Sequence, residues 1–272
     1  MAHLIIGCGY LGQHVARLWR DQGKRVMALT RGRSDELRAQ GIEPIVGDVM
    51  HRSSLTSLPE AEVVLYAVGF DRSAGRSFRE VYVEGARNVL SALPAPGRLI
   101  YVSTTSVYGQ MNGEEVDETS PTEPREPNGR AALDAENVVR DRRPEAMVLR
   151  FAGIYGPGRV LRRIAIEKGE SFAGDREKWL NLIQVEDGAK AIAAAAERGS
   201  PGETYLVSDG SPVRRREFYA YMAELLGAPP PVFSPGPTDE GGNRRVSNRK
   251  MIEFLGVLPR YPDYRAGLRA AI

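Results

Sequence analysis

The chain has 272 residues, of which 42% are hydrophobic, and its 37 basic and 35 acidic side chains leave a net charge of +2. This composition is ordinary for a globular protein and excludes the disordered class. No apolar run reaches the ~18–20 residues that cross a bilayer, and no basic block marks nucleic-acid binding. The first residues enter a strand without a basic leader, and the lone Cys8 cannot form an internal disulfide. We therefore expect a cytoplasmic protein with no membrane or nucleic-acid partner.

The first predicted element is an apolar strand, Ala2–Ile6, which a glycine-rich turn connects to an amphipathic helix starting near Tyr10. The turn reads Gly7-Cys8-Gly9-Tyr10-Leu11-Gly12. In a Gly-x-Gly-x-x-Gly turn the first glycine permits the tight turn, the second lets a diphosphate approach the backbone, and the third lets helix and strand pack closely. Free N–H groups at the helix N-terminus then face the anion. The spacing predicts a dinucleotide site.

Further apolar strands alternate with helices, which indicates a doubly wound parallel sheet of the Rossmann type. Strands are expected at 25–29, 43–46, 62–68, 98–103 and 145–151, and helices from 34, at 77–93 and at 128–142. Beyond Gly153 the pattern loosens. We expect a dinucleotide-binding domain over 1–153 and a small C-terminal α/β substrate lobe over 154–272, with 181–207 packing back onto the first domain.

The end of the second strand bears on which dinucleotide is bound. An acidic residue there would accept hydrogen bonds from the adenosine ribose of NAD, but this chain has Thr30, with Arg31 and Arg33 beside it. Arginine suits a 2′-phosphate because its forked N–H groups make charge-assisted hydrogen bonds. The sequence favours NADP over NAD, although both arginines also fit a solvated loop.

Other strand ends add candidate cofactor contacts. Asp48 follows the third strand, where its carboxylate can accept from the adenine amine, although an ordinary turn residue fits as well. Small residues at the end of the fourth strand let the cofactor lie against the sheet. The remaining candidates from these strand ends are Val49, Ala67, Val68, Gly69 and Ser103.

Four segments resemble one known group: 83–90 (VEGARNVL), 102–109 (VSTTSVYG), 150–158 (RFAGIYGPG) and 181–187 (NLIQVED). They are similar to the extended and atypical short-chain dehydrogenase/reductases, which include the NAD-dependent epimerases and dehydratases, over nearly the whole chain. The resemblance implies an oxidoreductase or epimerase acting on a small carbonyl or hydroxyl substrate. It also implies a homodimer formed through the helices at 77–93 and 128–142.

The resemblance has a gap at the catalytic position. In that family a Ser or Thr after the fifth strand, here Thr104, holds the substrate oxygen, and a Tyr four residues before a Lys handles the proton. The matching helix has Asn128 at the Tyr position and Ala132 at the Lys position, and none of the eleven tyrosines has Lys four residues on. Asparagine cannot titrate, whereas a positioned acid or base contributes roughly 10²–10⁴-fold.

The gap leaves two interpretations open. One is an enzyme that takes its proton from another donor, such as Tyr108, Tyr155 or water, although packing also explains Tyr108. The other is a dinucleotide-binding protein that has lost the family chemistry and acts as a redox sensor or regulatory partner. Substrate contacts are expected at Tyr155, Arg159 and Asn181. The three histidines lack metal-ligand spacing, so no metal is expected.

Overall fold

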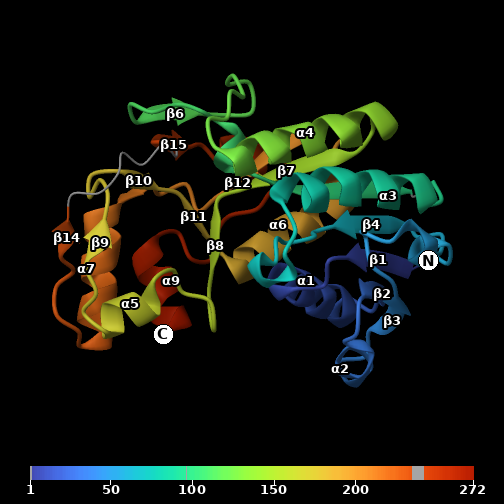
Figure 1. Ribbon diagram of the computed structural model, residues 1–272, viewed down its shortest axis with the longest axis horizontal. Coiled ribbons are helices and arrows are strands. Elements are labelled where there is room, and N and C mark those ends of the chain that lie inside the picture. Colours follow the sequence, from blue (N-terminus) through green and yellow to red (C-terminus); the bar gives the residue numbers. More distant parts are fainter. Residues whose placement is uncertain (1, 96, 235–241) are drawn as a thin grey trace.

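The computed structural model describes residues 2–95, 97–234 and 242–272, which form two lobes side by side (Figure 1). The larger lobe is built on a parallel sheet of seven strands. Across the sheet they are β12 (Thr204–Val207), β7 (Met147–Phe151), β5 (Arg98–Thr104), β4 (Val63–Tyr66), β1 (Ala2–Ile6), β2 (Arg25–Thr30) and β3 (Glu43–Val46). This order confirms the Rossmann fold, and its direction reverses between β1 and β4, where ligands bind in such sheets.

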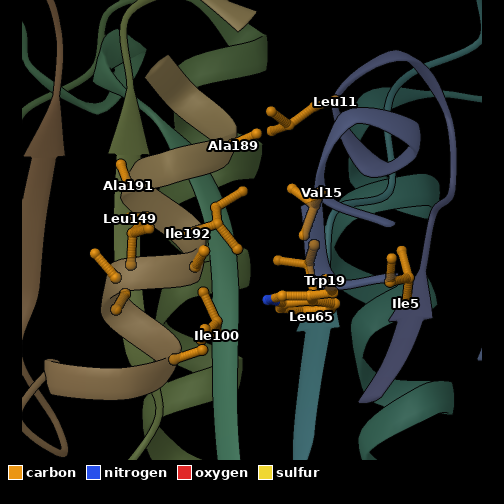
Figure 2. Close-up of a cluster of buried hydrophobic side chains, with 14 of the residues drawn as sticks. Ile5, Leu11, Val15, Trp19, Leu65, Ile100, Leu149, Ala189, Ala191 and Ile192 are labelled. Atoms are coloured by element: carbon orange, nitrogen blue, oxygen red, sulfur yellow. The ribbon is translucent and has the colours of Figure 1, made fainter. Parts of the chain in front are cut away.

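Successive side chains of a strand point to opposite faces of the sheet, so these apolar strands give the sheet two apolar faces. Helices cover both faces and bury them. On β1, Ile5 lies in the apolar cluster that includes residues of α1 (Tyr10–Asp21) and α6 (Val185–Arg198). Figure 2 shows this cluster, with side chains of α1, α6 and the strands gathered together. Leu4 and Ile6 lie in the opposite cluster, with residues of α3 (Gly85–Ala92) and α4 (Pro127–Arg142).

Shorter elements join these parts. They are α2 (Ser34–Ala39), the 3-10 helices η1 (Arg52–Leu55), η2 (Arg72–Ala74) and η4 (Thr105–Val107), the π-helix η3 (Glu80–Glu84) and the strand β6 (Glu114–Val116). Within the described ranges, no helix has the length and apolar character needed to cross a membrane.

The smaller lobe has its own apolar cluster, centred on Phe172, Phe218 and Tyr219. Its helices are α5 (Arg163–Glu167), α7 (Arg215–Leu226) and α9 (Tyr264–Ala271). Its short strands are β9 (Phe172–Ala173), β10 (Trp179–Leu180), β13 (Val213–Arg214) and β14 (Phe233–Ser234). Each of these strands pairs with one other, β10 with β13 and β14 with β9.

Two further strand pairs and one helix connect distant segments of the chain. β8 (Gly153–Tyr155) pairs with β11 (Leu182–Gln184), and β15 (Arg244–Val246) pairs with β6. α8 (Arg249–Leu255) packs against α6 and β12, so this C-terminal segment belongs with the core of the larger lobe.

The structure differs from the expected elements mainly where a pattern is short. The single helix expected at 77–93 is divided into η3 and α3, with a π-helical first part. The loop expected between the fifth strand and α4 contains β6, which the partner strand β15 orders by backbone pairing. A strand of three residues has too little alternation to be read from sequence.

A buried carboxyl group lies where the end of β12 meets the smaller lobe. The backbone N–H of Asp209 donates to the carbonyl of Leu182, and its Oδ1 accepts from the N–H of Ser211 at 2.9 Å. Its side chain is 6% exposed, and Oδ2 has no partner within the described residues. Burial, together with the nearby carboxylates of Asp263 and Asp187, raises the pKa of Asp209 to about 8.

Replacing this carboxyl group should change how stability depends on pH. The folded-state pKa lies above the ordinary value of about 3.9, so the folded protein holds the proton more tightly. Its contribution to the free energy of unfolding is full below pH ~4 and is lost as pH rises towards 8. Asp209→Asn should therefore flatten the fall in stability between pH 5 and 8.5, measured by chemical denaturation. The exposed Asp141→Asn serves as the control, and parallel curves for wild type and Asp209→Asn would contradict the assignment.

Candidate dinucleotide-binding site

The turn after β1 holds the start of α1 tightly against the sheet. Gly7 has φ +97°, and a Cβ there would lie 2.5 Å from the carbonyl group of Ala67. A Cβ on Gly12 would lie 2.6 Å from the carbonyl oxygen of Gly7. Cβ atoms do not approach other atoms so closely, so the turn requires glycine at both positions.

Gly9 differs from Gly7 and Gly12, because the position of its missing Cβ is open. A Cβ there would meet no atom within 4 Å. Gly9 is the N-cap of α1, no side chain accepts from the amides of the first turn, and that turn has no acidic residue. The N-terminus of a helix attracts anions through these amides and the helix dipole. The backbone N–H groups at Tyr10 and Leu11 therefore face space that a diphosphate can enter.

A pocket of about 650 Å³ opens beside this turn and extends over the ends of β2, β3 and β4. The predicted cofactor residues that line it are Gly7, Gly9, Thr30, Arg31, Arg33, Asp48, Val49, Val68 and Gly69. The pocket, the uncapped helix terminus and the space at Gly9 together fit a nicotinamide dinucleotide.

The other predicted cofactor residues lie outside the pocket lining. Tyr10 and Leu11 begin α1, Gly12 and Ala67 form the close backbone contacts, and Ser103 is buried, with its hydroxyl donating to Glu136 at 2.5 Å. Sequence reasoning missed several lining residues from the segment after β4: Phe70, Asp71, Ala74, Arg76 and Val81. The first four precede the predicted helix at 77–93, in a stretch without a regular period, whereas Val81 lies in that helix, where an apolar residue is expected only to pack.

Two arginines lie at the β2 end of the pocket, and both have acidic partners. Arg31 Nη2 lies 3.4 Å from Asp71 Oδ2, and Arg33 Nε donates to Glu36 Oε2 at 2.7 Å. The side chains of both pairs are 44–63% exposed, so each pair contributes little to stability. The loop itself is held by Thr30, whose Oγ1 accepts from the N–H of Arg33 at 3.0 Å.

Asp48 combines a turn role with its position in the pocket lining. Its Oδ1 accepts from the N–H of Met50 at 2.9 Å, and its Oδ2 lies 3.4 Å from His51 Nδ1. The adjacent carbonyl of Val49 accepts from Asn88 of α3 at 2.9 Å. These contacts fix the loop after β3, and the half-buried Asp48 remains part of the pocket lining.

The predicted catalytic residues lie after β5 and at the start of α4. Thr104 Oγ1 lies 3.1 Å from Ser106 Oγ and accepts from the N–H of Ser106. Asn128 is half-buried in the first turn of α4. Ala132 is buried in an apolar cluster with Val107 and Leu206.

Tyr108 has a structural environment. It is 1% exposed, its hydroxyl donates to the carbonyl of Asp117 at 2.8 Å, and it accepts from Arg150 at 2.7 Å. Burial raises the pKa of Tyr108 to about 12. Arg150 also binds the fully buried Glu136 of α4 at 2.7 Å, so this network holds the ends of β5 and β7 against α4. The buried Arg244 of β15 supports the same loop by donating to the carbonyl of Thr105 at 2.5 Å.

The three predicted substrate residues have different surroundings. The buried Tyr155 hydroxyl has no partner in the described part of the chain and abuts Gly267 of α9, where a Cβ would overlap it. The side chain of Asn181 makes two hydrogen bonds to the backbone of β15. Its Nδ2 donates to the carbonyl of Arg244, and its Oδ1 accepts from the N–H of Val246. Arg159 is exposed and lies over the ring of Tyr10. Residues 2–95, 97–234 and 242–272 contain no group of three or more His, Cys, Asp or Glu that could hold a metal.

The different surroundings of the turn glycines predict opposite effects of the same substitution. Gly9→Ala should leave the melting temperature unchanged, because its Cβ meets open space, yet weaken dinucleotide binding at least tenfold by filling the diphosphate position. Gly12→Ala should cost about 1–3 kcal/mol of stability, because its Cβ meets the Gly7 carbonyl. Calorimetric titration and thermal unfolding measure the two effects. Undiminished binding by Gly9→Ala would place the diphosphate elsewhere.

Comparison with known proteins shows the family of this chain and agrees with a nicotinamide dinucleotide as the ligand. The sequence profile of the NAD dependent epimerase/dehydratase family matches residues 3–208. Protein YeeZ of Escherichia coli (strain K12) is 29% identical over 95% of this chain and 96% of its own length. The 2-alkyl-3-oxoalkanoate reductase of Stenotrophomonas maltophilia is 29% identical over 82% of this chain and 74% of its own. The structure of a functionally unknown conserved protein from Silicibacter pomeroyi is 32% identical, with a TM-score of 0.80, and the match covers 99% of this chain and 97% of that one. The chain therefore belongs to the NAD dependent epimerase/dehydratase family.

Proposed function

We propose that this protein binds NADP(H) and transfers hydride to or from a small carbonyl or hydroxyl substrate without the Tyr–Lys pair of related enzymes. The observation that carries the proposal is the pocket, which joins the uncapped start of α1 to Arg31 and Arg33. Family membership supports the nicotinamide dinucleotide, and the reductase relative supports a carbonyl substrate.

The preference for NADP rests on charge at the ribose end of the pocket. A 2′-phosphate carries nearly two negative charges and accepts several hydrogen bonds, so it competes well for guanidinium groups. The pairs of Arg31 with Asp71 and of Arg33 with Glu36 are exposed and cost little to open. Thr30, at the end of β2, offers NAD no carboxylate for its ribose hydroxyls.

The chemistry at the other end of the site is simple. A bound nicotinamide donates or takes the hydride. The hydroxyls of Thr104 and Ser106, 3.1 Å apart, can orient a substrate oxygen, and the Asn128 amide can hydrogen-bond to it. None of these groups titrates near neutral pH, so the proton of the reaction is exchanged with water. Turnover should be slow relative to an enzyme with a positioned acid.

A second candidate function is dinucleotide sensing without turnover. The observation that favours it is the apolar environment of Ala132, together with the absence of lysine from the pocket lining in the described part of the chain. A protein with this site would bind the cofactor and signal its redox state through a partner.

The charge argument predicts a cofactor preference and a residue that causes it. The wild type should bind NADP+ more tightly than NAD+. Arg31→Ala should weaken the binding of NADP+ about tenfold and leave the affinity for NAD+ within twofold of the wild-type value. Isothermal titration of both nucleotides measures this. Arg38→Ala removes another exposed arginine of the same region, paired with Asp35, and serves as the control. NAD+ binding as tightly as NADP+ would refute the preference.

Introducing the Tyr–Lys pair distinguishes the hydride-transfer proposal from the sensor proposal. Asn128→Tyr with Ala132→Lys should raise NADPH oxidation with simple ketones by roughly 10²-fold or more if only the acid is missing. Turnover with a panel of aldehydes, ketones and quinones is followed by NADPH absorbance. Asn128→Tyr alone is the second variant, because Asn128 is half-buried whereas Ala132 is buried.

The outcomes of that experiment are distinct. Measurable turnover by the wild type, increased in either variant, supports the hydride-transfer proposal. Cofactor binding without turnover in the wild type and in both folded variants would contradict it and favour the sensor.

A further inference from the structure

A rigid turn from the start of the smaller lobe lies against the phosphate-binding turn of the larger lobe. Gly156 and Arg159 exchange two backbone hydrogen bonds, of 3.0 and 2.9 Å, around Pro157 and Gly158. Gly158 has φ +75°, and proline followed by glycine at the two central positions is typical of a type II turn. The position of the Arg159 backbone is therefore fixed.

Tyr10, the first residue of α1, connects this turn to the phosphate-binding loop. Its hydroxyl donates to the carbonyl of Pro157 at 3.1 Å. Gly156 has no room for a side chain, because a Cβ would lie 2.7 Å from the same hydroxyl. The Arg159 guanidinium lies over the Tyr10 ring, with Cζ 5.4 Å from the ring centroid. A cation from the second lobe thus lies against the side chain of the first residue of α1.

The charges around this guanidinium leave it available to a ligand. Arg159 makes no ion pair with any residue in the described part of the chain, and its side chain is exposed. The carboxylate of Glu186, in the first turn of α6, also acts on Tyr10, and it is engaged by Arg260 at 3.5 Å and by the Tyr261 hydroxyl at 3.2 Å. The other cations of the site are Arg31 and Arg33, at the β2 end of the pocket, and Arg76, from the segment after β4.

The glycine turn has no cation of its own, and Arg33 contacts it from outside, with Nη1 donating to the carbonyl of Cys8 at 3.3 Å. Residues 7 to 12 contain no Lys or Arg, and α1 has no side-chain cap. A dinucleotide brings two negative charges to this place, and backbone amides alone supply only partial positive charge. Arginine forms forked hydrogen bonds to phosphate oxygens, and the Tyr10 ring can support its flat face.

We propose, on the basis of the proposed cofactor function, that Arg159 binds the diphosphate of the dinucleotide from the second lobe. The cofactor is then held between the lobes, with backbone amides of α1 on one side and the guanidinium on the other. This assigns Arg159 to the cofactor rather than to the substrate. An anionic group of the substrate is the other source of the same oxyanion chemistry, and it is distinguished by binding measured without substrate.

The experiment compares a ligand that contains the diphosphate with one that lacks it. NADP+ and adenosine 2′-monophosphate share the adenosine and the 2′-phosphate, but only NADP+ has the diphosphate. Both are titrated calorimetrically, at low and at moderate salt, against wild type, Arg159→Ala and Arg159→Lys. Arg163→Ala is the matched control, because Arg163 begins α5 in the same lobe and pairs with Glu167 at 2.8 Å.

Arg159→Ala should weaken the binding of NADP+ roughly tenfold and leave the affinity for adenosine 2′-monophosphate within twofold of the wild-type value. Arg159→Lys should recover part of the loss, and the salt dependence of NADP+ binding should decrease in Arg159→Ala because one charge contact is gone. Arg163→Ala should behave as wild type. Thermal unfolding of each variant checks that the turn still folds.

Three results would overturn the assignment. Unchanged NADP+ affinity in Arg159→Ala would leave the guanidinium to the substrate or to solvent. Equal losses for both ligands would indicate a general structural effect. A wild type that binds neither NADP+ nor NAD+ would end both this assignment and the proposed function. A wild type that binds only NAD+ would refute the NADP preference alone. The effect of Arg159→Ala would then be tested by comparing the binding of NAD+, which has the diphosphate, with that of adenosine, which lacks it.

Discussion

The close backbone approach between Gly7, Gly12 and Ala67 is the constraint on which the rest of the site depends. Because no Cβ fits at Gly7 or Gly12, α1 starts directly above the gap between β1 and β4, where the strand order reverses. Gly9 then leaves the first-turn amides open to the pocket. The pocket walls come from the ends of β2, β3 and β4, so the position of the whole site follows from this packing.

Much of the larger lobe could be predicted from the sequence, because its strands are continuous apolar runs and its helices are long. β1 and β4 are buried at every position, which such runs predict directly. The smaller lobe could not be predicted in detail. Strands such as β9 and β14 have two residues each and exist only through pairing across about sixty residues, which no local pattern encodes. The π-helical turn η3 likewise interrupts a helix whose sequence pattern is continuous.

At the site, local features could be predicted and distant partnerships could not. The glycine spacing and the arginines after β2 follow from short motifs, and the pocket contains both. The partner of Arg31, Asp71, comes from forty residues further on. Tyr108, a candidate proton donor by sequence, bonds to the buried Arg150, which also binds Glu136, a set of contacts that only the folded sheet brings together. The approach of Arg159 to Tyr10 is of the same kind, since it joins residues from the two lobes.

The most direct measurement of the central claim is a crystal structure of the protein grown with NADPH. We predict the diphosphate over Gly9 at the N-terminus of α1, the 2′-phosphate beside Arg31 and Arg33, and the nicotinamide near Thr104 and Asn128, with no tyrosine–lysine pair beside it. An empty pocket at saturating NADPH would contradict the account. A nucleotide bound elsewhere, away from the glycine turn, would contradict it equally.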